Sequence, residues 1–290
     1  LFLDPLSGEV HDHVGGRADL AAGIVRAIGP AAVRFGEDHL RMLRAVRFAA
    51  FFGFVLEEAT RDAIVRMAHR VTTVSPERIA AELRAMVSRP GRQRALELLE
   101  QTGLAREVLP ELAAPGGGGH WREVTQVVGA LDEPDLSTAL ALLAGDLPTL
   151  ALRNVASRLR LSARALKTAV WLHEAGAFFA AGQPAVRPWS EVQPWLADHR
   201  APLLADLMRA RAACGLGDPA AAAWVSDQVI RPRPELDPPA LVTGHDLDAL
   251  GVPEGRVVGD MLAALRALQL DGVIRSRQEA VDWVRTRTRS

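Results

Sequence analysis

The helical periodicity of polar and apolar positions between residues 34 and 54 predicts one long helix. Its polar side chains recur at every third position, at Asp38, Arg41, Arg44 and Arg47. The residues between them are mostly leucine, valine, alanine and phenylalanine, and they supply a broad apolar face for a core. Spacing of three keeps successive side chains adjacent but rotates the row slowly around the helix, so the four residues can follow a curved ligand groove.

The same charges also fit an ordinary solvated helix face. Glu37 and Asp38 stand in the first turn, where acids complement the helix dipole. Between Asp38 and Glu57, however, the sequence contains no acid, so we expect the arginines to have no partner at i−4 or i+4. A solvated helix usually mixes its signs, and the unmixed row therefore favours a binding site.

A carboxylate beside a guanidinium offers a defined chemistry for recognising a base. The carboxylate of Asp38 only accepts hydrogen bonds, and the guanidinium of Arg41 only donates them. The Watson–Crick edges of cytosine and adenine offer the complement, an amino donor next to a ring acceptor. Guanine and uracil place a carbonyl where that amino group stands, so two acceptors would meet. The pair is therefore expected to favour C and A, with Arg44 and Arg47 holding phosphate or Asp38 itself.

Three blocks of sequence resemble the class II family of tRNA nucleotidyltransferases, which comprises the CCA-adding enzymes and the bacterial poly(A) polymerases. In chain order they are DHVGGRADLAAGIVRAIG, GEDHLRMLRAVRFAAFFGF and VSPERIAAEL. The resemblance implies that Glu37, Asp38 and Arg41 belong to the nucleotide-selecting motif, with Asp38 and Arg41 reading the base edge. It also implies that Arg44 and Arg47 line the triphosphate pocket and that the substrates are CTP and ATP.

Other residues of these blocks match supporting positions of the family. Asp19 matches the connector that follows the catalytic head domain, where it either orients the chain by hydrogen bonds or caps a helix. Glu77, Arg78 and Glu82 match the fifth motif, and the role that the resemblance implies is to brace the base-reading helix from behind. We expect these four residues to support the site rather than to take part in the chemistry.

The start of the chain suggests that it is a fragment. Short strand patterns at Leu1–Leu3, Glu9–His11 and Ile24–Ala27 cannot form a stable sheet alone, so we expect a larger sheet upstream. In the family, a head domain precedes the counterpart of Leu1 and carries the paired aspartates that hold two Mg²⁺ ions. The resemblance therefore places the Mg²⁺ ions upstream of Leu1, and we expect neither a catalytic residue nor a metal site within the chain.

Helical periodicity and the resemblance together predict a mainly α, elongated fold, with a short remnant of the β-sheet head at the N-terminus. The expected parts are the end of the head with its connector (1–33), a helical neck (34–112), a helical body (113–230) and a tRNA-binding tail (231–290). The glycine run within 113–120 predicts a flexible break. Four prolines within 231–239 predict a semi-rigid linker that is neither helix nor central strand.

The body resembles a degenerate HD domain, a fold whose histidines and aspartates bind metal for phosphohydrolysis. Glu123 stands where the first metal-binding histidine would be, and Ala144 with Gly145 stands where the His-Asp pair would be. Asp146 and His173 remain, but two ligands cannot fill a metal site alone. A phosphohydrolase of this type is therefore disfavoured.

The tail offers a weaker contact for RNA. The loop GVPEGRVVG presents backbone N–H groups and Arg256 to an anion such as an RNA phosphate, although a tight corner between two helices has the same sequence signature. Asp246 and Asp248 form an Asp-x-Asp pair in a helix-start context. We interpret them as a cap and surface acids rather than as metal ligands.

Composition narrows the location and the partners. A net charge of −1 over 290 residues gives no global basic signature, so any RNA contact is expected to be local. The single Cys214 excludes an internal disulfide and suits a reducing cytoplasm. No segment approaches the roughly 18 consecutive apolar residues of a membrane span. The resemblance implies tRNA and nucleoside triphosphates as partners, with neither DNA nor a membrane.

The resemblance implies transfer of CMP and AMP to the 3′ end of tRNA by a parent protein that includes the head, and we expect the chain alone to be inactive. A poly(A) polymerase shares every motif named above, and addition of C only or A only is equally compatible with them. A noncatalytic RNA-binding scaffold is the alternative from another class of function, favoured if the natural chain starts near Leu1.

Overall fold

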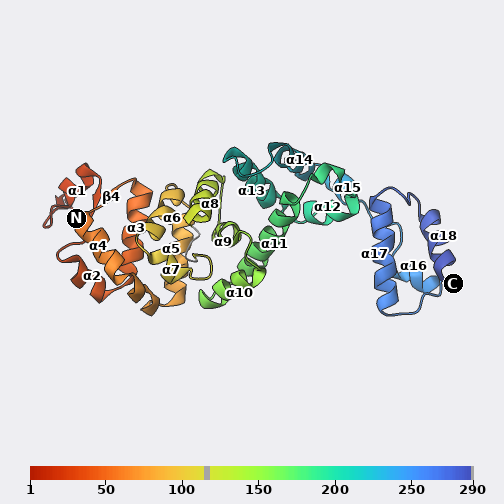
Figure 1. Ribbon diagram of the computed structural model, residues 1–290, viewed down its shortest axis with the longest axis horizontal. Helices are drawn as coiled ribbons and strands as arrows, with labels where there is room; N and C mark the ends of the chain where they lie inside the picture. Colours follow the sequence, from red (N-terminus) through yellow and green to blue (C-terminus); the bar gives the residue numbers. More distant parts are fainter. Residues whose placement is uncertain (114–117, 289–290) are drawn as a thin grey trace. The chain divides into compact units, whose positions relative to one another are not determined.

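The computed structural model describes residues 1–113 and 118–288, and the chain divides into two compact units. Unit 1 comprises Leu1–Ala177 and Ala210–Leu216, and unit 2 comprises Phe178–Arg209 and Gly217–Ser290. Both units consist mainly of helices, which confirms the predicted fold class (Figure 1). The division into four parts stays a prediction beside these two units.

Unit 1 contains four short strands and most of the helices of the chain. In chain order its elements are β1 (Phe2–Leu3), β2 (Val10–His11), α1 (Gly16–Ala22), β3 (Ile24–Val25), α2 (Ala31–Glu37), α3 (Leu40–Phe52), β4 (Val55–Leu56), α4 (Glu58–Met67), the 3₁₀ helix η1 (Ala68–Thr73), α5 (Pro76–Val87), α6 (Arg92–Gln101), α7 (Leu104–Val108), α8 (Gly118–Ala130), α9 (Leu136–Ala144), α10 (Thr149–Arg158) and α11 (Ala163–Ala180).

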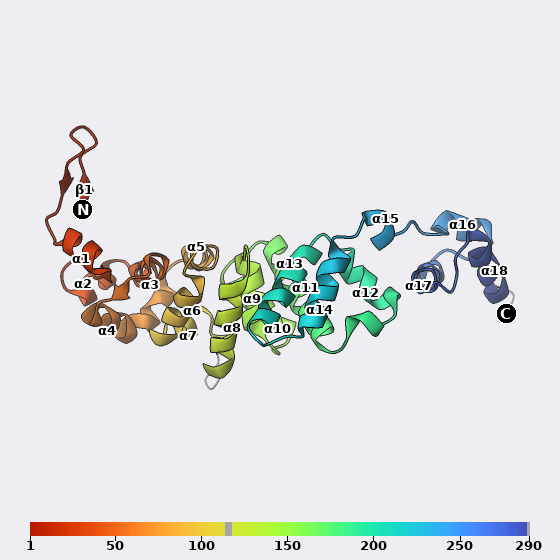
Figure 2. The same cartoon turned by 90° about the horizontal axis from the view of Figure 1, so that it is seen from above.

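The strands form two separate two-stranded sheets. β1 pairs antiparallel with β2 in a hairpin that precedes α1 (Figure 2), and β3 pairs parallel with β4, with Ile24 opposite Val55. The three short strands predicted near the N-terminus are confirmed. β4 was not predicted, because a two-residue strand is too short to show an alternating pattern.

The prediction of one helix from residue 34 to residue 54 is wrong, because the chain breaks between α2 and α3. Asp38 has an extended backbone, with φ −153° and ψ 105°, and its side chain accepts a hydrogen bond from the N–H of Leu40 at 3.1 Å. A short carboxylate that bonds to nearby backbone in this way competes with helix formation and starts a new helix instead. Arg41, Arg44 and Arg47 therefore share α3, whereas Asp38 stands just before it.

The core of unit 1 lies around α3, which packs against α5 and α6 (Figure 1). The inward face of α3 is fully buried at Met42, Leu43, Val46 and Ala49. Gly91, with φ +81°, lets α6 begin against the end of α3, since a Cβ at this position would lie 2.2 Å from the backbone oxygen of Ala50. The arginine row thus lies on a helix whose other face is buried in the core.

Helix α6 also holds α8. The guanidinium of Arg92, at the start of α6, donates to the carbonyl oxygens of Val128 at 2.8 Å, Gly129 at 3.2 Å and Leu131. Helix C-terminal carbonyls have no partner within their own helix, so an arginine suits them. The predicted flexible break at 113–120 lies partly outside the described residues, and at residues 118–120 the chain is already helical in α8.

Unit 2 contains the remaining helices. They are the 3₁₀ helix η2 (Pro184–Val186), α12 (Trp189–Leu196), α13 (Ala201–Ala213, shared with unit 1), α14 (Pro219–Val229), α15 (Arg233–Leu236), α16 (Gly244–Ala249), α17 (Arg256–Leu270) and α18 (Arg277–Thr288). The prediction that residues 231–239 contain no helix is wrong. α15 forms because Pro232 is its N-cap and Pro234 stands in its first turn, where a backbone N–H is not needed.

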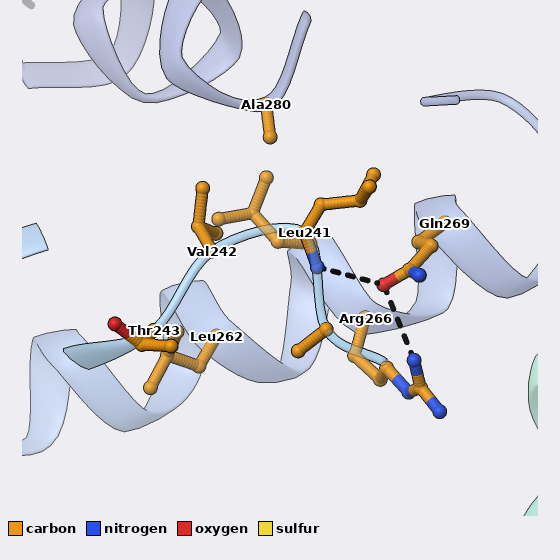
Figure 3. Close-up of a pocket in the computed structure, with 9 residues that line it drawn as sticks. Leu241, Val242, Thr243, Leu262, Arg266, Gln269 and Ala280 are labelled. Carbon is orange, nitrogen blue, oxygen red and sulfur yellow. Dashed lines mark hydrogen bonds between the residues drawn. The ribbon is translucent and has the colours of Figure 1, made fainter. Parts of the chain in front are cut away.

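Helices α16 to α18 enclose a small core of their own, in which Leu247 and Val284 are fully buried. Beside this core lies a mainly apolar pocket of about 280 Å³, where Gln269 accepts a hydrogen bond from the N–H of Leu241 (Figure 3). Asp246 makes a capping box with Thr243 at the start of α16. The interpretation of Asp246 as a cap is confirmed.

Candidate nucleotide-binding site

Asp38 lies in the break between α2 and α3 and is held from two sides. Its Oδ1 accepts a hydrogen bond from the N–H of Leu40, and its Oδ2 accepts one from Nη2 of Arg78 at 2.9 Å. Burial alone would raise the pKa of Asp38, but these hydrogen bonds and the positive charges of Arg78 and Arg41 lower it below its ordinary value. At neutral pH the side chain is therefore an ionised carboxylate that only accepts hydrogen bonds.

Arg41 stands in the first turn of α3 and is held by α2. Its Nη1 donates to Oε2 of Glu37 and, at 2.8 Å, to the backbone oxygen of Arg34. Arg34 donates to both carboxylate oxygens of Glu37, and the hydrogen bonds from Arg41 and then Arg34 lower the pKa of Glu37. The expectation that the arginines have no partner at i−4 is wrong for Arg41, because Glu37 stands four residues before it and the stretch without acids begins only after Asp38.

Arg44 and Arg47 continue the row toward Glu82 of α5. Nε of Arg47 donates to Oε2 of Glu82 at 2.6 Å, and both side chains are only 13% exposed. Arg44 is half exposed, and its Nε lies 3.9 Å from Oε1 of the same carboxylate. The guanidinium of Arg47 also lies 4.3 Å from the centre of the Phe48 ring. Arg47 is thus held inside, whereas Arg44 remains open to a ligand.

A pocket of about 290 Å³ lies beside this row. Its charged lining consists of Arg26, Arg34, Arg41 and Arg44, and no acid lines it among the described residues. Four arginines in one lining supply positive charge that attracts an anion such as a phosphate group, although Glu37 pairs with Arg34 and Arg41, and Asp19 pairs with Arg26. Phe48 and other apolar side chains complete the wall and exclude water from part of it. The pocket has the lining expected for a phosphorylated ligand.

The remaining predicted site residues lie around the pocket or away from it. Oδ1 of Asp19 accepts a hydrogen bond of 2.8 Å from Nε of Arg26, and Arg26 lines the pocket. Glu77, in the first turn of α5, accepts from Nη1 of Arg160 at 2.7 Å. Arg256 belongs to unit 2, where its side chain is 94% exposed and forms an ion pair within α17.

Sequence reasoning missed Arg26 and Arg34 as pocket residues. Arg34 lies on α2 and Arg26 just after β3, so neither belongs to the row with spacing of three. The only local signal was the position of Arg26 inside a block that resembled the family, and Arg34 stands two residues before the next block. Their convergence with Arg41 and Arg44 depends on the fold of α2 against α3, which helical periodicity does not encode.

The described residues contain no group of three His, Cys, Asp or Glu side chains that could hold a metal ion.

Gly145, at the end of α9, has φ +52°, and a Cβ there would lie 2.5 Å from the ring of His120. Within the part of the chain that the structure describes, no helix is long and apolar enough to cross a membrane.

Known proteins resemble the chain over part of its length. The family described as "Probable RNA and SrmB-binding site of polymerase A" matches residues 53–114. The CCA-adding enzyme of Geobacillus stearothermophilus is 43% identical over 106 residues, which are 37% of this chain and 26% of that protein. The CCA-adding enzyme of Bacillus velezensis is 35% identical over 122 residues, 42% of this chain and 29% of that protein. The chain thus matches less than a third of the length of these curated relatives.

Solved structures resemble the chain over a longer range. The CCA-adding enzyme of Bacillus stearothermophilus in complex with CTP has a TM-score of 0.75 and 27% identity, covering 98% of this chain and 70% of that one. The CCA-adding enzyme of Thermotoga maritima complexed with tRNA has a TM-score of 0.63 at 18% identity, covering 96% and 67%, which shows a shared fold.

The helical scaffold and the matched region place the chain in a class of helical regions that resemble those of CCA-adding enzymes and the described RNA-binding region of polymerase A. Within that class, the chain resembles the CCA-adding enzymes over the 106 to 122 residues matched above.

Proposed function

We propose that the chain is the nucleotide-selecting and tRNA-binding part of an enzyme that adds CMP and AMP to the 3′ end of tRNA. The observation that carries the proposal is the Asp38 carboxylate, which Arg78 holds by a hydrogen bond and which stands three residues before Arg41, a residue that lines the arginine-rich pocket. Asp38 accepts from the exocyclic amino group of C or A, and Arg41 donates to the adjacent ring nitrogen. A base with a carbonyl in the amino position meets a second acceptor and is rejected.

The other residues of the site hold the phosphates or the reading pair. Arg44, with Arg26 and Arg34 on the same pocket, is placed to bind the triphosphate. Arg47 is turned away by its ion pair with Glu82, so its role is to fix α3 against α5 rather than to touch phosphate. Arg78 and Glu82 thereby act as the brace that the family motif implied.

The residues present do not fit a magnesium site, since the described part of the chain lacks a group of three potential ligands. The resemblance to the family implies that the Mg²⁺ ions of the proposed reaction are bound by its catalytic head domain. The chain supplies base selection and RNA binding, and CTP, ATP and tRNA are its proposed partners.

The test uses the protein extended upstream through the expected metal-binding segment. It is incubated with Mg²⁺, CTP, ATP and a tRNA transcript lacking its 3′ CCA, and the products are resolved at single-nucleotide length. Growth by C, C and A that then stops supports the proposal. No extension would overturn it in favour of an RNA-binding scaffold.

A poly(A) polymerase is the second candidate, because the matched family is described from polymerase A. In the same assay this enzyme would add a long run of A and leave CTP unused. Addition of C only or of A only would identify a partial activity of the same family.

Asp38→Ala in the extended protein tests the reading pair. The variant is expected to accept GTP and UTP nearly as well as CTP and ATP while it still binds Mg²⁺. Asp62→Ala, which removes an exposed acid of α4 outside the pocket, is the matched control and keeps the selectivity of the parent. Equal discrimination by parent and Asp38→Ala would refute the template.

A further inference from the structure

Arg160 is held in an unusual backbone conformation. Its φ is +49°, and it is the only residue other than glycine with a positive φ in the described part of the chain. It follows the end of α10, where the N–H of Leu161 donates to the oxygen of Ala156 at 2.9 Å, a helix ending that glycine normally provides. An arginine is strained here because its Cβ approaches the following carbonyl oxygen. Such strain persists where the surroundings hold the residue, and it points to a role for the side chain.

The side chain of Arg160 reaches a residue 83 positions away in the sequence. Its Nη1 donates to Oε1 of Glu77 at 2.7 Å, in the first turn of α5. The two side chains are 68% and 54% exposed, and ion pairs with this exposure contribute little to stability. Stability therefore does not explain why the chain places an arginine at a glycine position.

The contact has a geometric consequence at the site. Glu77 is followed directly by Arg78, whose Nη2 donates to Oδ2 of Asp38 at 2.9 Å. The first turn of α5 is thus held by Arg160 on one side and by Asp38 on the other. A shift of this turn would move the Arg78 guanidinium and, with it, the Asp38 carboxylate.

We propose that Arg160 is a positioning residue for base selection: by holding Glu77 it fixes the first turn of α5 and so, through Arg78, sets the orientation of the Asp38 carboxylate. The inference rests on the proposed function of Asp38. It connects the corner between α10 and α11 with nucleotide choice, although Arg160 itself touches neither the pocket nor Asp38 in the described contacts.

Arg160→Gly tests the inference, because it removes the side chain and the backbone strain together. The thermal midpoint of the variant is expected to stay equal to the parent's or to rise. In the extended protein, discrimination of CTP and ATP against GTP and UTP is expected to fall roughly twofold to thirtyfold, the range that corresponds to the effects of residues that act through a neighbour. Arg160→Lys, which keeps the charge, should retain more of the discrimination than Arg160→Gly does. Arg153→Ala, on the exposed face of α10, is the matched control and leaves discrimination unchanged.

A second readout needs only the 290-residue chain. The pKa of Asp38, followed by carboxyl ¹³C NMR, should move up toward its ordinary value in Arg160→Gly, because the Arg78 hydrogen bond is less well held. An unchanged pKa of Asp38 would overturn the inference. So would unchanged discrimination in Arg160→Gly when Asp38→Ala abolishes it, and the proposed function would then stand. If Asp38→Ala also leaves discrimination unchanged, the proposed function itself fails.

Discussion

Replacing Glu82 by glutamine tests the innermost contact of the arginine row. Glu82→Gln keeps the size of the side chain and an acceptor oxygen but removes the negative charge that faces Arg47. Nε of Arg47 lies 2.6 Å from this carboxylate, and each side chain is only 13% exposed. The guanidinium of Arg47 would therefore keep its charge in a nearly buried place without an ionic partner.

The expected cost follows from that burial. Breaking a fully buried ion pair costs about 3–5 kcal/mol, and a solvent-exposed pair is worth about 0–1 kcal/mol. At 13% exposure we expect Glu82→Gln to lower the free energy of unfolding by about 2–3 kcal/mol. Arg47→Gln should lower the free energy of unfolding by a similar amount. The double variant should lose less than the sum of the two single losses, and the difference, which is the coupling energy of the pair, should be about 1–2 kcal/mol.

Urea unfolding followed by far-UV circular dichroism measures these values, with hydrogen exchange of the α3 and α5 amides as a local measure, since the two units need not unfold together. Glu100→Gln, an exposed acid of α6, is the control and should change stability by less than about 0.5 kcal/mol. If Glu82→Gln behaves like this control, the contact is an ordinary surface pair and α5 does not brace α3 through it.

Three further perturbations test the scaffold. Gly91→Ala places a Cβ 2.2 Å from the backbone of α3 and should lower the free energy of unfolding by about 3 kcal/mol or more. Gly53→Ala, the control, has a similar φ of +69° but open space around the Cβ, and should lower it by only about 1 kcal/mol. Thermal unfolding measures both values. Arg92→Ala leaves helix-end carbonyls without their donor, so we expect a loss of about 2 kcal/mol and faster exchange in α8; unchanged exchange would contradict this. The pKa of Asp246 is lowered from 3.8 to about 2, first by the backbone hydrogen bond from Thr243, so its stabilisation is present above pH 3.8 and is lost as the pH falls toward 2. Asp246→Asn should flatten the decline of the melting temperature between pH 4 and pH 2, and a decline as steep as the parent's would refute that origin.

The sequence predicted the elements that depend on local pattern. The apolar positions of α3 and the spacing of Arg41, Arg44 and Arg47 are periodic, so both the helix and its charged face could be anticipated. The break at Asp38 was missed, because the preference of one aspartate for its own backbone is weaker than the periodic signal around it.

The contacts that hold the site could not be derived from pattern. Glu82 and Arg78 meet Arg47 and Asp38 from 35 and 40 residues away, and no local rule encodes a pairing at that separation. Resemblance to the family named these residues as a brace but gave no partner for each. The ion pair between Glu77 and Arg160 had no signal at all, since an arginine at a left-handed position is the opposite of what propensity predicts.

Under the proposed function, the lowered pKa of Asp38 bears directly on selectivity. A protonated carboxyl group could donate its hydrogen to the carbonyl of G or U, and rejection of these bases would be lost. Burial favours the protonated form, and the hydrogen bond from Arg78 opposes it by stabilising the ionised form, while the remaining lone pairs of the carboxylate stay available for a base. Arg41 uses Nη1 for Glu37 and for the Arg34 carbonyl, and its other N–H groups can still donate. Under the proposed function, both reading groups are therefore fixed before the nucleotide arrives, and selection requires no rearrangement of the site.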